Sequence, residues 1–196
     1  MHRATILMSL AFAACAAAPA VHDAYPSGAP RAAADSAELA RLHAEDQADR
    51  TPPAGAAIDW TRITPRDHVR AARIKELNAE GRLQTAADFH HAAMILQHGD
   101  APEDFLLAHE LCILAIASGD ASALWLCAAS EDRFLGRIER KQRFATQYRN
   151  DGPATPMRLT PVDDGVTDAM RASFHCPTLA EAKANEARFN RPAKQP

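Results

Sequence analysis

Apolar residues recur at intervals of three and four along most of the chain beyond residue 35. No stretch alternates apolar and polar residues as a half-buried strand does. The clearest helical runs lie between Thr85 and Leu135, with breaks only at residues 98–100 and 119–120. Connections of two or three residues place consecutive helices antiparallel. The pattern therefore predicts an all-α fold of antiparallel helical hairpins with tetratricopeptide-like repeat packing.

Capping residues and helix breakers predict the other boundaries. A first helix over 35–50 begins at Asp35, with Glu38 at capping-box spacing, and stops before two prolines. Trp60 is expected to dock the following loop on the core. A second helix begins at Thr64-Pro65 and ends at Gly81.

The next three helices have acceptor side chains at their starts and glycines at their ends. The expected starts are Thr85, Asp100 and Asp120, and the expected ends are Gly99, Gly119 and Gly136. Gly99 is expected in the left-handed conformation that favours glycine at a helix C-terminus. Residues 137–161 are expected to be extended or irregular, and two short helices should follow over 163–174 and 178–190.

The first 34 residues have a different character. Residues 1–14 combine a short basic start with an apolar segment, which is typical of a secretory signal peptide. Cys15 follows small residues as in a bacterial lipoprotein signal, so we expect it to be lipidated and to become the N-terminus; cleavage after Ala18 or Ala20 is the alternative. Residues 15–34 are rich in Ala, Pro and Gly and are expected to be a flexible tether before one domain over 35–196. The expected location is periplasmic and membrane-anchored.

Charge and cysteine content narrow the function. The net charge is −3, which argues against a dedicated nucleic-acid-binding protein.

Three cysteines remain beyond Cys15, namely Cys112, Cys127 and Cys176, and an odd number cannot all pair within the chain. A bridge between Cys112 and Cys127 and a pair of small buried thiols are the two interpretations, of which we favour the thiols.

Two polar residues fall inside apolar helix faces on a helical wheel. His109 lies among the positions Phe105, Cys112, Ile113 and Ile116, and Asp132 lies among Ala121, Trp125, Ala128 and Leu135. Antiparallel register across the two turns brings His109 level with Ser130, close to Asp132, and level with His91. The register therefore predicts that His91, His109 and Asp132 lie at one height of a three-helix stack.

Three interpretations fit such a cluster. It is a satisfied hydrogen-bond network that fixes helix register, a metal site for zinc or iron with His91, His109 and Asp132 as ligands, or an acid/base pair in which Asp132 makes His109 more basic. The hydrogen-bond network is the favoured interpretation, so no cofactor is predicted.

His98, after Gln97, is expected to bond helix-end carbonyls or to line a pocket at the hairpin tip. The basic run from Arg133 to Arg149 is expected to be a solvated helix end, or else a surface for anionic partners.

The order of several short motifs resembles that of an uncharacterised bacterial domain family. They are Asp46-Gln47 with Arg50, His91-Ala-Ala-Met94, Gln97-His98-Gly99, Pro102 to His109, Trp125-Leu126, Asp132-Arg133, and Gln142 to Gln147. The closing motif departs from the family pattern, because Ala145 stands where that pattern has glycine. The resemblance implies no known activity, but it identifies Gln97, His98, Arg133, Gln142 and Gln147 as candidate binding residues and His91, His109 and Asp132 as residues to test.

Together these features predict an exported, lipid-anchored helical protein that binds a partner protein in the cell envelope. The alternative is a metal-binding protein or an enzyme that uses His91, His109 and Asp132, with His109 and Asp132 as the candidate catalytic pair.

Overall fold

The computed structural model describes residues 34–152 and 155–191. In this part of the chain seven α-helices, one short 3₁₀ helix and a two-stranded antiparallel sheet are formed. The expected signal peptide, Cys15 and nearly all of the expected tether lie outside the described residues. None of the helices in the described ranges combines the length and apolar character needed to cross a membrane.

Helices α1 (Ala37–Asp49) and α2 (Trp60–Ala79) form the first hairpin, and both begin at different residues from those predicted. Ser36, one residue after Asp35, caps α1 and accepts a hydrogen bond from the Leu39 amide. Asp59 caps α2 five residues before the expected cap Thr64, so Pro65 lies inside the helix. The amide that Pro65 lacks would have bonded an exposed carbonyl, which water can serve instead. Trp60 is the first residue of α2 and is exposed, so the prediction that it docks a loop was wrong.

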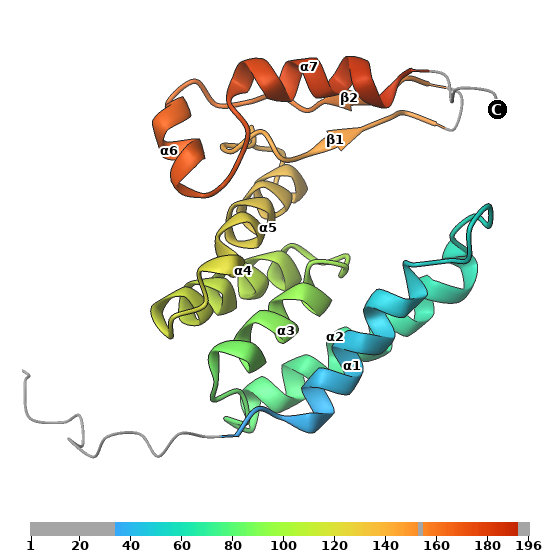
Figure 1. Ribbon diagram of the computed structural model, residues 1–196, viewed down its shortest axis with the longest axis vertical. Helices are drawn as coiled ribbons and strands as arrows, with labels where there is room; N and C mark the ends of the chain where they lie inside the picture. Colours follow the sequence, from blue (N-terminus) through green and yellow to red (C-terminus); the bar gives the residue numbers. More distant parts are fainter. Residues whose placement is uncertain (1–33, 153–154, 192–196) are drawn as a thin grey trace, which may run out of the picture. The chain divides into compact units, whose positions relative to one another are not determined.

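The central helices are α3 (Ala86–Leu96), α4 (Pro102–Ala117) and α5 (Leu124–Arg137), with the 3₁₀ helix η1 (Ala121–Ala123) before α5. Figure 1 shows α3 packed between the α1–α2 hairpin and α4, and α4 packed in turn on α5. Thr85 caps α3, as predicted. Asp120 caps η1, whereas α5, the helix it was expected to cap, begins after Ala123. Helix α4 begins after Ala101, whose amide donates a hydrogen bond to the Asp104 carboxylate. The mostly helical character expected from the sequence is confirmed.

The core of these helices is built from small and aliphatic side chains. Alanines at the contact surfaces, such as Ala92, Ala108 and Ala115, are completely buried and let α3 and α4 approach closely. Cys112 and Cys127 belong to the same core as free thiols, which agrees with the favoured interpretation of these cysteines.

Gly99 has a different role from the one expected. Its backbone is not left-handed, unlike that of Gly119, where φ is +100°. A Cβ on Gly99 would instead lie 2.7 Å from both Cβ and Cγ of Asp104. Glycine is therefore required at 99 because the first turn of α4 passes directly over it.

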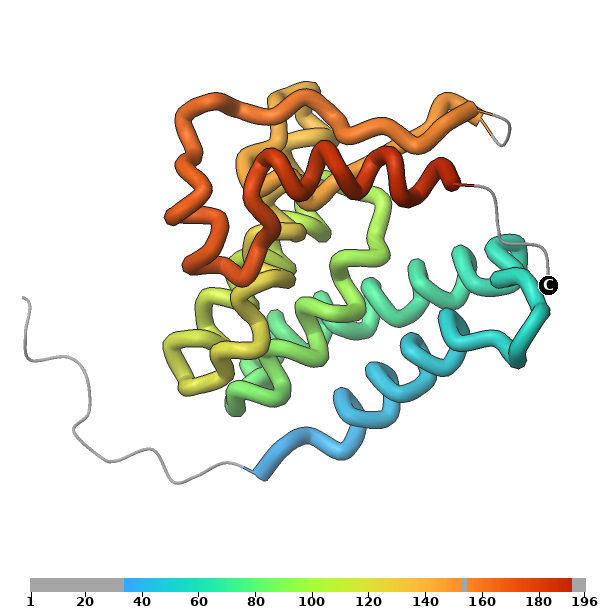
Figure 2. Tube along the Cα trace, turned by 45° about the horizontal axis from the view of Figure 1, so that its top comes forward, coloured from blue at the N-terminus to red at the C-terminus, as the bar shows by residue number. Residues whose placement is uncertain are grey.

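The chain after α5 folds back over that helix. Strands β1 (Tyr148–Arg149) and β2 (Arg158–Leu159) pair in residues 137–161, where extended or irregular chain was expected and no strand pairing was predicted. Short helix α6 (Asp168–Ser173) and helix α7 (Leu179–Phe189) follow, and α7 runs alongside β2 (Figure 2). A second apolar cluster of Ala128, Phe144, Val166 and Cys176 attaches this segment to α5.

Candidate functional site

A cleft of about 920 Å³ lies between the end of α3, the last turns of α5 and the β1–β2 hairpin. Its lining is rich in positive charge, from Arg133, Arg137, Arg140, Lys141, Arg149 and Arg158. The acids that line it are Asp132, Glu139 and Asp151. Among the described residues Arg140, Lys141 and Arg158 have no carboxylate within ion-pair distance, while Arg137 lies over the ring of Phe105 and 3.7 Å from Asp100. The cleft therefore presents an excess of cations to whatever enters it.

Asp132 builds one wall of the cleft. Its carboxylate is buried and accepts hydrogen bonds from the backbone amides of Arg143 (2.6 Å), Phe144 (3.0 Å) and Thr146 (3.1 Å), and from the Thr146 hydroxyl (2.7 Å). These bonds use both carboxylate oxygens. Asp132 therefore acts as an acceptor that shapes residues 143–146 into a tight loop on α5.

Gln142 and Gln147 complete this loop. The Gln142 amide is buried, donates to the carbonyls of Gln147 and Thr160 at 2.9 Å each, and accepts from the Gln147 amide. Ala145 sits at the tip with φ at +61°. Only glycine adopts this conformation freely, and another residue pays about 1–2 kcal/mol for it. The glycine of the resembled motif thus has a conformational reason at this position.

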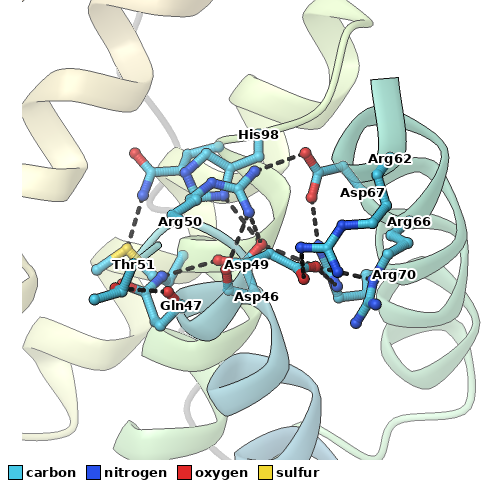
Figure 3. Close-up of polar contacts among 12 residues, drawn as sticks. Asp46, Gln47, Asp49, Arg50, Thr51, Arg62, Arg66, Asp67, Arg70 and His98 are labelled. Carbon is cyan, nitrogen blue, oxygen red and sulfur yellow. Dashed lines mark hydrogen bonds and ion pairs between the residues drawn. The ribbon is translucent and has the colours of Figure 1, made fainter. Parts of the chain in front are cut away.

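A buried network of charged side chains lies beside the cleft, between α1 and α2 (Figure 3). Asp46 is completely buried and accepts hydrogen bonds from Arg50 (2.8 Å) and from the Gln47 amide (2.8 Å). Arg50 also donates to Asp67 at 2.6 Å, so a single guanidinium joins the two helices. The three residues of the first motif, Asp46, Gln47 and Arg50, are therefore joined by hydrogen bonds to the Asp46 carboxylate.

Arg70 closes the network from the α2 side. It is buried and donates to Asp49 at 2.9 Å and to Asp67 at 2.6 Å. Burial alone would lower the pKa of Arg70, but the hydrogen bonds to Asp67 and Asp49 outweigh it and raise the pKa. Buried charges are tolerated only with such pairing, so this network ties α1 to α2.

His98 connects the network to the cleft. Its Nδ1 lies 3.2 Å from Asp46 Oδ1, and the same ring lines the cleft. Burial acts to raise the pKa of Asp46, but the hydrogen bond from His98 and the charges of His98, Arg50 and Arg70 hold it below its usual value. Gln97, the preceding residue, also lines the cleft, and among the described residues its side-chain amide contacts the sulfur of Met94, a weak acceptor.

Four of the five candidate binding residues therefore border one cleft: Gln97, His98, Arg133 and Gln147. The fifth, Gln142, supports the cleft wall from behind.

The structure does not bring His91, His109 and Asp132 together. His109 Nδ1 contacts the Cys127 carbonyl at 3.0 Å, within a turn of the predicted register, and His91 stacks on His43 with ring centroids 4.4 Å apart. The Asp132 carboxylate bonds to residues 143–146 because three backbone amides there offer more hydrogen bonds than the single imidazole of His109 could.

In the part of the chain that is described, no three His, Cys, Asp or Glu side chains are grouped so as to hold a metal ion. Cys127 Sγ lies 3.4 Å from His109 Nδ1, but burial raises the pKa of this thiol to about 11, so it is not an activated nucleophile.

His90, Asp120 and Ser122 have the residue types of a hydrolase triad but not its arrangement. Asp120 and the Ser122 hydroxyl both approach the same ring nitrogen, Nδ1 of His90, at 2.6 and 3.4 Å. A triad needs the carboxylate and the nucleophile on opposite ring nitrogens. The cluster caps η1 and is structural.

Some residues of the site were missed by sequence reasoning. Asp67 and Arg70 stand three residues apart on one face of α2, and this spacing was a signal for the buried pair. Arg158 and Tyr148 line the cleft only because β1 and β2 pair, and nothing in their local sequence indicates it.

Comparison of the chain with models of known protein families, with curated proteins and with solved structures found no match.

Proposed function

We propose that this chain is an exported helical protein, anchored through a lipid on Cys15, that binds a partner protein of the cell envelope in the cleft beside α5. The proposal also treats α3, α4 and α5 as hairpin packing of the tetratricopeptide-like kind, in which the hollow of a helical stack receives the partner. Export and anchoring rest on the pattern of residues 1–15, as in a lipoprotein signal.

The observation that carries the proposal is the lining of the cleft. It combines six cations with the apolar surfaces of Phe105, Tyr148 and Leu159. Three acids, Asp132, Glu139 and Asp151, line the cleft with these six cations, so its lining keeps an excess of positive charge. A mixed apolar and cationic hollow fits a polypeptide segment with acidic side chains better than a flat lipid surface, which a convex basic patch would contact. We therefore place an acidic segment of the partner in the cleft.

Cross-linking in the native cell tests this proposal. A photoreactive amino acid at Arg140, on the cleft rim, is expected to capture one partner protein. The same amino acid at Val69, which is exposed on α2, serves as the matched control and should capture none. Capture from both positions, or from neither, would refute a cleft-specific partner.

Fractionation tests the anchor separately. Cys15→Ser is expected to move the protein from the membrane fraction to the soluble periplasmic fraction. A variant that stays in the membrane would show that the lipid is not the anchor.

The metal alternative has its own measurement. Metal analysis of the purified protein with and without His109→Ala tests it, because one zinc or iron per chain that disappears in the variant would replace the present proposal.

A further inference from the structure

Arg133 is the most unusual charged residue of the cleft. It lies in the second half of α5 and lines the cleft between Gln97 and Gln147. Its Nη1 atom is buried, and within the described residues no acceptor reaches it. Burial lowers the pKa of Arg133, and the nearby charge of Asp132 offsets this only in part.

No acid in the described part of the chain serves as its partner. Asp132 is adjacent in sequence, but neighbours on a helix point about 100° apart, and both oxygens of Asp132 are bonded to residues 143–146. Asp46 is engaged by Arg50 and His98, and Asp151 pairs with Arg149 at 3.6 Å. An arginine cannot shed its proton to relieve burial, so among the described residues the guanidinium of Arg133 is left without a counter-charge that a bound carboxylate can supply.

We propose that Arg133 binds a carboxylate of an acidic peptide. The peptide enters the cleft, and the two carboxylate oxygens accept two parallel N–H···O hydrogen bonds from the guanidinium. This inference rests on the proposed function and specifies the chemistry of the partner. The side-chain amide of Gln97, whose contact among the described residues is the Met94 thioether, lines the same cleft as a further donor.

The helix ends favour a carboxylate over a phosphate. Phosphate sites in proteins are built on helix N-termini, where backbone amides carry partial positive charge. Here α3 and α5 contribute their C-terminal residues to the cleft, and these ends carry partial negative charge. The one N-terminus nearby, that of α4, is already bonded by its own Asp104. A singly charged group is repelled less by such ends than a doubly charged one.

Fluorescence anisotropy with defined peptides tests the inference on the full-length protein. The probes are labelled hexaglutamate with an amidated C-terminus, hexaglutamine with a free C-terminal carboxylate, and amidated hexaglutamine without any carboxylate. The first two distinguish a side-chain carboxylate from a chain end. We expect hexaglutamate to bind and amidated hexaglutamine not to bind, whereas binding of the hexaglutamine chain end alone would overturn the assignment to an acidic side chain.

Two variants locate the binding group. Arg133→Met keeps the length of the side chain and removes the charge, so binding should weaken about tenfold to one hundredfold. Arg158→Met, on the exposed rim, should weaken binding only about twofold to threefold. Arg133→Met should also melt at a higher temperature than the wild type, because a buried charge without a partner is removed.

Each other result overturns the inference. The inference fails if the wild-type protein binds neither carboxylate peptide, or if Arg133→Met binds as well as the wild type. It also fails if Arg133→Met melts at a lower temperature than the wild type. Finally, it fails if inorganic phosphate displaces the peptide at a lower concentration than acetate does. If cross-linking from position 140 captures the partner equally in wild type and in Arg133→Met, the proposed function stands and the carboxylate inference fails. If the peptide result holds but no partner is captured, the proposed function fails instead.

Discussion

Replacement of Asp132 by alanine isolates the contribution of the carboxylate that shapes the cleft wall. Asp132 is buried and accepts from three backbone amides and one hydroxyl between residues 143 and 146, at 2.6 to 3.1 Å. In the variant these amides lose their acceptor while they remain enclosed by α5 and the loop.

The expected cost follows from the number of donors left without an acceptor. Each buried unsatisfied amide destabilises a protein by about 1–3 kcal/mol. Partial relaxation of the loop lets water reach some of them, so we expect a total loss of about 4 kcal/mol, a large part of a typical stability of about 5–15 kcal/mol. Asp132→Asn keeps one carbonyl oxygen and should lose about half as much.

Urea denaturation followed by circular dichroism measures the difference in the free energy of unfolding. Glu131→Gln is the matched control, because Glu131 contacts only the Arg143 Nε atom, at 3.2 Å and on a partly exposed surface. This control should change stability by no more than about 0.5 kcal/mol. A loss below about 1 kcal/mol in Asp132→Ala would refute the structural role. Full stability together with lost ligand binding would favour the acid/base interpretation.

Three further predictions concern other parts of the fold. Gly99→Ala should destabilise the protein by about 1–3 kcal/mol in the same urea assay, whereas Gly136→Ala, in α5 with open space at its Cβ, should stabilise it by up to about 1 kcal/mol; equal effects would contradict the close approach at 99. Burial, together with the neighbouring His91 and His90 charges, lowers the pKa of His43, and burial together with His90 lowers that of His91, so folding favours their neutral forms. Their contribution to stability is present above the unfolded pKa of about 6.5 and is lost as the pH falls through the lower folded value. The melting temperature should therefore drop between about pH 6.5 and 5, and a His43→Phe/His91→Phe double variant that drops as steeply would disprove the assignment. Burial also raises the pKa of all three core thiols, to about 11 for Cys127 and about 12 for Cys176, so a thiol reagent should modify them in urea and hardly at all in the native protein; fast labelling of the folded chain would show that this core opens.

The candidate site was predictable where a side chain acts on its near neighbours. Thr85 and Asp88 form a capping box that the local spacing indicates, and α3 begins where that spacing predicts. Asp132 was identified as buried from the helical wheel, and it is, but the same wheel placed Trp125 in the core, and this side chain is 42% exposed. The wheel orders residues around one helix and contains no information on which neighbour covers each face.

The partner of Asp132 could not be predicted because it lies in a segment without periodicity. Residues 143–146 have neither a helical nor an alternating pattern, and their amides become donors only once the chain folds back on α5. Likewise Arg50 and Arg70 find Asp67, Asp49 and Asp46 through the crossing of α1 and α2.

The sequence by itself determined the helical class, the cap of α3 and the choice of polar residues worth testing, because these depend on spacings of three or four residues along the backbone. The tertiary structure alone decided that Gln97, His98, Arg133 and Gln147 share a cleft, while His91, His109 and Asp132 do not share a site. It also decided that Arg133 lacks an acceptor among the described residues. Whether a buried charge is satisfied depends on which distant donors and acceptors reach it, and packing of α5 against the returning chain settles that competition.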